Sequence, residues 1–165
     1  MDEKLWRVFE NVNKWLEYSE QKNAIILTFI GLQLTIGSIF IKNSDVWFKV
    51  SAIILGICFL LTLLSFFPKT AIPNWIYNRA KSSRKPSEND NLIFYGDIIK
   101  YSQQEYIEKL EKYFSGEIKG HKDLEDICTQ ITVNSQIAFT KYRVFKTITW
   151  LMVIGQMLFL ASFWL

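Results

Sequence analysis

The sequence predicts an all-α integral membrane protein with three transmembrane helices, an N-terminal amphipathic helix and a cytoplasmic helical segment between the second and third spans. Of its 165 residues, 50% are hydrophobic and 21% are charged, and the two kinds are segregated along the chain. Three stretches without Asp, Glu, Lys or Arg run for about 18 residues or more, which is enough to cross a hydrocarbon core about 30 Å thick. We assign the spans to residues 24–41, 46–67 and 147–165, within a single domain that covers residues 1–165.

The N-terminal segment, residues 1–23, has the pattern of an amphipathic helix. Leu5, Val12 and Leu16 recur at helical spacing with charged residues between them. No Pro or Gly occurs before Gly31, so this helix either runs directly into the first span or bends near its end to lie along the membrane surface. A charged segment of this length before the first span argues against a cleaved signal peptide, so we expect the span to be retained.

The distribution of basic residues predicts the orientation of the spans. Residues 68–86 carry five Lys or Arg and no acidic residue, whereas residues 42–49 carry two lysines and one aspartate. Positively charged flanks are retained in the cytoplasm. We therefore expect the N-terminus and residues 68–146 in the cytoplasm, a tight hairpin around Asn43-Ser44, and the C-terminus on the far side of the membrane.

The segment between the second and third spans, residues 68–146, is expected to be helical after an exposed loop. The apolar run 92–99 needs a packing partner, and Ser102 and Glu105 have the spacing of a capping box that opens a helix ending near Ser115-Gly116.

A second helix is expected to begin at Asp123 as N-cap and to run without a breaker into the third span. Such a helix would be about 60 Å long at 1.5 Å per residue. We recognise no heptad register in the sequence.

The charge-free stretches of the spans, residues 24–41, 50–67 and 147–165, carry several polar residues. An ionisable residue within a span would suggest transport or a proton relay, so its absence from these stretches argues against both. Gln33 and Gln156 either join helices through hydrogen bonds or line a polar pore. Replacing each by Leu would separate the two interpretations, because a pore residue affects flux and a packing residue affects assembly.

The residue patterns do not predict an enzyme, a metal site or a cofactor. The sequence has no nucleophile elbow or phosphate loop, and His121 is its only histidine. Cys58 lies in a span and Cys128 in the polar segment, so a disulfide between them is not expected. The basic residues between Lys69 and Lys85 either fix the topology or, with neighbouring aromatic rings, bind an anion.

Three groups of residues, in this order, resemble the Pycsar effector transmembrane family of bacteria. The first leads into the first span, the second is the apolar run followed by Tyr106, and the third leads towards the third span. In sequence they are Glu20-x-Lys22-Asn23-Ala24; Leu92-Ile93-Phe94-Tyr95-Gly96-Asp97-Ile98; and Asp123-Leu124-x-x-Ile127-x-x-Gln130-Ile131 with Ile137-Ala138 and Lys141-Tyr142. Pro68-Lys69 also resembles the family pattern after the second span, with Lys where Arg is more usual.

The resemblance implies an anti-phage effector. A partner pyrimidine nucleotide cyclase would make cyclic CMP or cyclic UMP on infection, and the effector would then disrupt the inner membrane and cause abortive infection. A ligand of this kind has a base to stack and a phosphate to neutralise, so we expect ligand contacts, and a homo-oligomer, from such a protein. The candidate ligand residues are Arg84, Tyr95, Lys100, Tyr106 and Lys141.

Each candidate also has a simpler interpretation. Phe94 and Tyr95 have the character of packing residues, and Gly96 that of a turn residue with positive φ. For the whole protein the alternatives are a constitutive membrane scaffold or immunity protein without nucleotide sensing, and a small channel or transporter. A neighbouring cyclase gene would argue against the scaffold.

Overall fold

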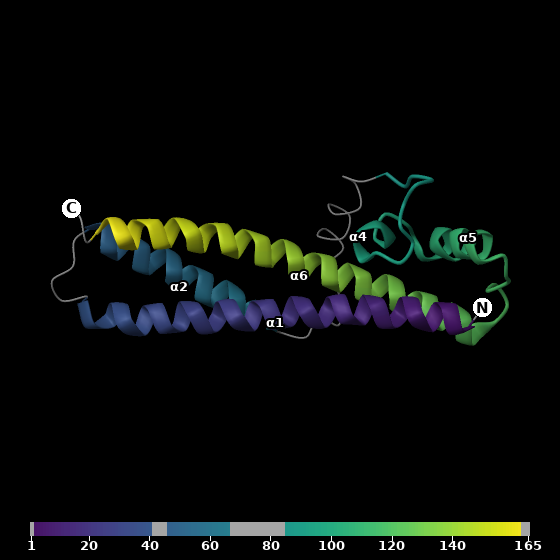
Figure 1. Ribbon diagram of the computed structural model, residues 1–165, viewed down its shortest axis with the longest axis horizontal. Helices are drawn as coiled ribbons and strands as arrows, with labels where there is room; N and C mark the ends of the chain where they lie inside the picture. Colours follow the sequence, from purple (N-terminus) through teal and green to yellow (C-terminus); the bar gives the residue numbers. More distant parts are fainter. Residues whose placement is uncertain (1, 41–45, 67–84, 163–165) are drawn as a thin grey trace. The chain divides into compact units, whose positions relative to one another are not determined.

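The computed structural model describes residues 2–40, 46–66 and 85–162, and within these ranges it is helical with no strand (Figure 1). Its helices are α1 (Asp2–Phe40), α2 (Val46–Phe66), α4 (Tyr95–Ile98), α5 (Gln103–Phe114) and α6 (Lys122–Ala161). The chain divides into two compact units. The first unit comprises Met1–Tyr18 and Lys69–Thr140, and the second comprises Ser19–Pro68 and Lys141–Leu165.

The N-terminal segment and the first span form one continuous helix. α1 has 39 residues and no break at Ser19, whose side chain is fully buried. The sequence left open whether this helix runs directly into the first span or bends near its end, and in the structure it runs directly into the span. The hairpin expected at Asn43-Ser44 lies outside the described residues.

The core of the first unit joins three segments that are distant in sequence. Leu5, Val8 and Val12 of α1 pack with α5 and α6. The apolar run 92–99 was predicted to need a packing partner, and it has one, because Leu92, Ile98 and Ile99 are all at most 5% exposed. The remaining fully buried apolar side chains of this core are Tyr106, Leu110, Ile118, Cys128 and Ile131.

Both ends of α5 are as predicted. The Ser102 hydroxyl accepts the backbone N–H of Glu105 at 3.3 Å, and the Glu105 carboxylate accepts the backbone N–H of Ser102 at 2.6 Å. The helix ends where Ser115 adopts a left-handed conformation with φ of 52°. Gly116 then donates its N–H to the carbonyl of Glu111 at 3.2 Å, which satisfies a carbonyl at the end of the helix.

The prediction that α6 begins with Asp123 as N-cap is wrong. The helix begins at Lys122, and the His121 carbonyl accepts the N–H of Leu124 and that of Glu125, both at 3.0 Å. Asp123 therefore lies in the first turn, where its charge still complements the helix dipole. The expected continuity is confirmed, because α6 runs for 40 residues to Ala161.

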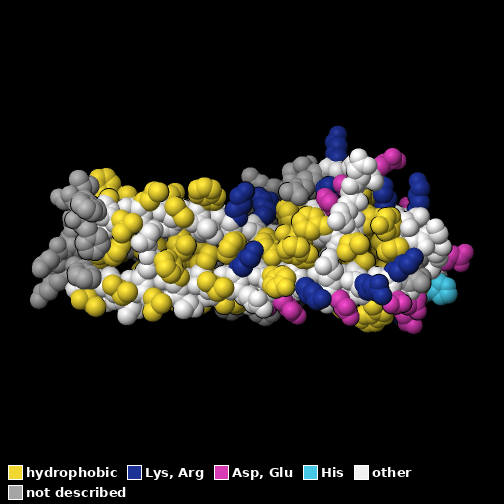
Figure 2. All heavy atoms as spheres, in the orientation of Figure 1, with side chains coloured by type: hydrophobic (Ala, Val, Ile, Leu, Met, Phe, Trp, Pro, Cys, Tyr) yellow, Lys and Arg dark blue, Asp and Glu magenta, His cyan; other side chains and the backbone are white. Residues whose placement is uncertain are grey.

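The second unit is a bundle of the C-terminal part of α1, α2 and the C-terminal part of α6. Its core contains Ile26, Ile30, Leu55, Cys58 and Ile148. The described residues include three helices that are long and apolar enough to cross a membrane, and these are α1, α2 and α6. On the face that Figure 2 shows, many side chains of this bundle are hydrophobic, whereas charged side chains gather over the first unit. Apolar residues on the outside suit contact with lipid.

The buried face of α1 has a spacing that the sequence analysis did not recognise. Ser19, Asn23, Ile26 and Ile30 are all buried, at alternating intervals of four and three residues. This is the heptad spacing of helices that pack lengthwise against a neighbour. Ser19 and Asn23 concealed it, because polar residues interrupt the apolar pattern by which such a register is recognised.

Candidate ligand site and membrane bundle

The loop before α5 in the first unit is held by a buried carboxylate. Lys100 Nζ lies 2.5 Å from Asp90 Oδ1 and 2.6 Å from Asp97 Oδ1, and its side chain is only 13% exposed. Asp90 Oδ2 accepts the Ser87 N–H and the Tyr101 hydroxyl, each at 2.8 Å. The loop 87–101 is therefore closed on itself by charge-assisted hydrogen bonds.

This network shifts the pKa values of its members. Burial acts to raise the pKa of Asp90, but the hydrogen bonds from Lys100, Ser87 and Tyr101 outweigh it and hold that pKa below its usual range. The hydrogen bonds to Asp90 and Asp97 raise the pKa of Lys100. Burial, with the Asp90 carboxylate, raises the pKa of Tyr101 to about 12. Lys100, a predicted ligand residue, is thus already paired with two carboxylates.

Tyr106, a second predicted ligand residue, is fully buried. Its hydroxyl donates to the carbonyl of Leu92 at 2.9 Å, and burial raises its pKa strongly. The side chain thereby ties the start of the apolar run to α5. Its role in ligand binding remains a prediction.

Tyr95, a third candidate, belongs to an aromatic cluster in the first unit. Its ring centroid lies 5.5 Å from that of Trp15 and 4.6 Å from that of Phe94. The interpretation of Gly96 as a turn residue with positive φ is wrong, because Gly120 is the only described glycine with such a φ. A Cβ on Gly96 would instead lie 2.6 Å from the Phe94 ring, so this position is kept small to accommodate the cluster.

The remaining candidates do not join these three residues. Lys141 belongs to the second unit, where it pairs with Glu20, and Arg84 lies outside the described residues. The structure therefore brings Tyr95, Lys100 and Tyr106 into one unit, where Tyr106 is fully buried and Lys100 is paired with two carboxylates. Ligand binding by any of the five candidates remains a prediction.

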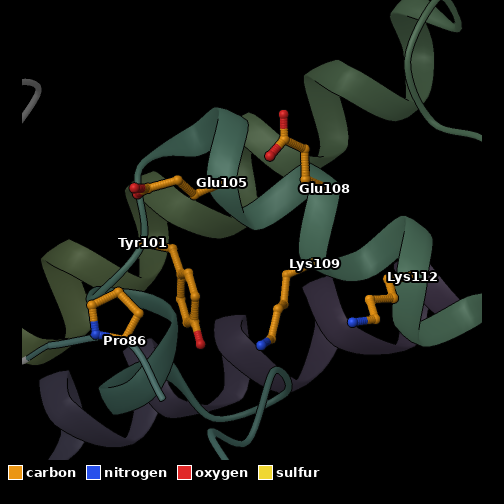
Figure 3. A pocket seen from close by; sticks show the side chains of 6 residues that line it. All are labelled: Pro86, Tyr101, Glu105, Glu108, Lys109 and Lys112. Carbon is orange, nitrogen blue, oxygen red and sulfur yellow. The ribbon is translucent and has the colours of Figure 1, made fainter. Parts of the chain in front are cut away.

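A cavity of about 310 Å³ opens on the first unit beside α5 (Figure 3). The Glu105 carboxylate is already bound to the Ser102 N–H, and Glu108 pairs with Lys119 at 2.9 Å. Lys109 and Lys112 also line the cavity, and neither has an ion-pair partner among the described residues. The cavity is lined by Pro86, Tyr101, Glu105, Glu108, Lys109 and Lys112.

The charges around this cavity are segregated by direction. Figure 3 shows the ammonium ends of Lys109 and Lys112 and the hydroxyl end of Tyr101 pointing to one side, and the carboxylates of Glu105 and Glu108 pointing away from them. The two lysines share a face of α5 because residues three apart are neighbours on a helix. Neither lysine was among the predicted ligand residues. Their spacing on one helix face can be recognised in the sequence, but their position beside Tyr101 depends on the fold of the loop.

Polar side chains join the helices of the second unit. Gln33 donates from Nε2 to Oε1 of Gln156, and the Ser51 hydroxyl donates to the carbonyl of Gly155 at 2.7 Å. A Cβ on Gly155 would lie 3.2 Å from Ile54, so α2 and α6 approach closely at this point. These contacts are what the packing interpretation of the two glutamines requires. The pore interpretation remains a prediction.

In the described ranges no group of three His, Cys, Asp or Glu side chains is placed to hold a metal ion. Cys58 and Cys128 are free and buried, and His121 is exposed.

The described residues are helical, with three apolar helices of membrane length and a charged helical unit, which is the organisation of a membrane protein. The family model described as the Pycsar effector protein domain matches residues 4–165. The chain therefore belongs to the Pycsar effector family and is a Pycsar anti-phage defence effector, which places it in the context of cyclic nucleotide signalling. No curated protein and no solved structure matches the chain.

Proposed function

We propose that this protein senses a cyclic pyrimidine mononucleotide, cyclic CMP or cyclic UMP, and in response disrupts the bacterial inner membrane and causes abortive infection. The observation that carries this proposal is that α1 and α6 each run unbroken from the charged unit into the apolar bundle. A change in the first unit therefore has two continuous helices through which it acts on the second. The nucleotide comes from a partner cyclase.

The cavity beside α5 is the binding site in this proposal. Its volume of about 310 Å³ is near the lower end of the range for small-molecule sites, which suits a mononucleotide. Lys109 and Lys112 neutralise the cyclic phosphate, and the base lies towards Pro86 and Tyr101. A nucleotide that binds one arrangement of this unit better than another shifts the population towards that arrangement.

The proposed orientation follows from the basic residues that flank the second span. The N-terminus and the first unit lie in the cytoplasm, where a cyclase product is available, and the C-terminus lies outside the inner membrane. Exposed apolar side chains on the bundle, such as Ile53, Leu60 and Ile154, contact lipid or a second copy. Disruption by a homo-oligomer of such bundles needs no charged residue within the spans.

Titration of the full-length protein in lipid nanodiscs with each cyclic nucleotide tests the sensing step. We expect cyclic CMP or cyclic UMP to bind, and binding to weaken at least about tenfold in the Lys109→Gln/Lys112→Gln variant, because two charge-assisted contacts are lost. The matched control is Lys14→Gln/Lys122→Gln, which removes two exposed lysines away from the cavity. Absence of binding by any cyclic nucleotide would refute sensing, and equal losses in both variants would refute the site.

The second candidate function is a constitutive membrane scaffold or immunity protein. The contacts that favour it are the Gln33 to Gln156 and Ser51 to Gly155 hydrogen bonds, which suit a permanently packed bundle. Under this alternative, expression with an active cyclase would leave the membrane potential unchanged. A small channel is a weaker alternative, for which Gln33→Leu and Gln156→Leu would abolish flux while the protein still assembles.

A further inference from the structure

We propose that Glu20, Lys22, Asn23, Lys141 and Tyr142 form a latch that holds the second unit in its resting arrangement, and that the Glu20 to Lys141 pair must break before the membrane is disrupted. These five residues, called the latch below, join α1 to α6. The proposal rests on the proposed function for its readout, because membrane leakage reports the release of the latch.

The contacts of the latch are reciprocal. Lys141 of α6 reaches across to pair with Glu20 of α1, and Lys22 of α1 lies over rings of α6, with Nζ 5.0 Å from the centroid of Tyr142 and 5.6 Å from that of Phe145. Each helix thus offers one cation to the other, once to a carboxylate and once to aromatic faces. Sliding or turning one helix against the other breaks both contacts.

The latch lies at a point where an ion pair has more effect than it has at the surface. The Lys141 side chain is only 7% exposed, whereas Glu20 is 51% exposed. Removing one partner of a pair that is buried on one side leaves an uncompensated charge, which destabilises that arrangement more than the loss of a solvated pair does. Lys141 therefore makes the resting arrangement depend on Glu20.

The latch belongs to a series of polar pairs between α1 and α6. Glu20 and Lys141 are 121 positions apart in sequence, and Gln33 and Gln156 are 123 positions apart. A nearly constant separation means that the two helices run parallel in this unit. Polar pairs at buried positions of a lengthwise helix packing specify a single register, because each loses its partner when the register changes.

The first unit has a pair of the same separation. Asn134 donates to Asn13 at 2.8 Å, and these residues are 121 positions apart. Each of them precedes its counterpart in the latch by seven residues, which is one heptad. The same register of α1 and α6 is therefore specified independently in each unit.

The resting arrangement also contains an unfavourable element. Asn23 is 1% exposed, and its Oδ1 accepts no hydrogen bond from any described residue. A buried carbonyl without a partner costs stability, and so does the desolvation of Lys141. These costs bring the resting arrangement closer in free energy to an alternative in which the groups are solvated or paired, as a switch requires.

Charge reversal tests the latch in dye-loaded vesicles that contain the full-length protein. Glu20→Lys and Lys141→Glu each break the pair, and the double variant restores it with the charges exchanged. We expect each single variant to leak at about tenfold lower nucleotide concentration, or without nucleotide, since a larger competent population lowers the apparent dissociation constant. The double variant should return towards the wild type.

The matched control is Glu3→Lys, which breaks the ion pair between Glu3 and Arg7, one turn apart on α1. The two side chains of this pair are 80% and 76% exposed. The control variant should leak as the wild type does. The helical circular dichroism signal of every variant is measured in the same vesicles, so that loss of folding is recognised. If a reversal fails to fold, Glu20→Gln and Lys141→Gln remove the pair with smaller changes.

The outcomes separate the latch from the proposed function. If the wild type leaks with nucleotide and folded single variants respond as it does, the latch is refuted and the function stands. If the double variant is as leaky as the singles, the pairing is refuted. If the wild type never responds to nucleotide but the single variants leak and the double does not, the proposed function fails and the latch stands.

Discussion

Replacing Asp90 by Asn should loosen the loop before α5 far more than the same kind of change at the surface. The carboxylate is 5% exposed and binds Lys100 Nζ at 2.5 Å, the Ser87 N–H at 2.8 Å and the Tyr101 hydroxyl at 2.8 Å. Breaking a buried ion pair costs about 3–5 kcal/mol. Lys100 keeps its contact with Asp97 at 2.6 Å, so we expect a loss of stability just below this range, about 2–3 kcal/mol.

Hydrogen exchange of the full-length protein in nanodiscs measures this loss locally. The amides of Lys100 and Tyr101 donate to the carbonyls of Asp97 and Ile98, so they exchange only when the loop opens. A loss of about 2 kcal/mol makes exchange roughly 30-fold faster. Glu3→Gln, at an exposed pair, should cost about 0–1 kcal/mol in its own segment. Equal, small effects of the two substitutions would refute the argument that Asp90 holds this loop.

Two further predictions concern pH and packing. The pKa values of Asp90 and Glu111 are lowered in the folded protein, and that of Glu111 is lowered by hydrogen bonds from the Lys119 and Ile118 N–H groups. The stability that these two carboxylates contribute is therefore present above about pH 4.5 and is lost as the pH falls below it. Thermal melting between pH 3 and pH 7 should show this loss of stability, and the loss should be smaller in the Asp90→Asn variant. Gly96→Ala should destabilise the first unit by about 1–3 kcal/mol, because its Cβ would lie 2.6 Å from the Phe94 ring. Unchanged exchange protection in the Gly96→Ala variant would contradict the packing argument.

The helices of this protein were predictable where the signal is local. The lengths of the charge-free runs predicted the three membrane helices, and Ser102 with Glu105 predicted the start of α5. The absence of Pro and Gly between Asp123 and Lys146 predicted that α6 continues into the third span. In each case the residues that decide the structure are neighbours in sequence or lie within one helix.

The candidate site was less predictable, because its properties depend on contacts between distant residues. Lys100 has the positive charge that a phosphate-binding residue needs, but Asp90, ten positions earlier, already neutralises that charge. Lys109 has no such partner among the described residues, and nothing local distinguishes the two lysines. Position 96 accepts only a small residue because the Phe94 ring lies against it, and no rule about glycine backbone conformation indicates such a contact.

The polar pairs between α1 and α6 were not predicted, for a related reason. Asn13, Glu20 and Gln33 each interrupt an apolar pattern, and each is paired with a residue more than 120 positions away. Two of these partners, Lys141 and Gln156, were singled out individually from the sequence. That they are partners follows only from the parallel packing of the two helices.

Leakage from vesicles shows whether a cyclic pyrimidine nucleotide makes this protein disrupt a membrane. The full-length protein is reconstituted in dye-loaded vesicles of bacterial inner-membrane lipids, and cyclic CMP, cyclic UMP, cyclic AMP and linear CMP are added separately. We expect dye release with cyclic CMP or cyclic UMP and none with the other two nucleotides. Protein that is inserted and folded but releases no dye with either cyclic pyrimidine nucleotide would contradict it.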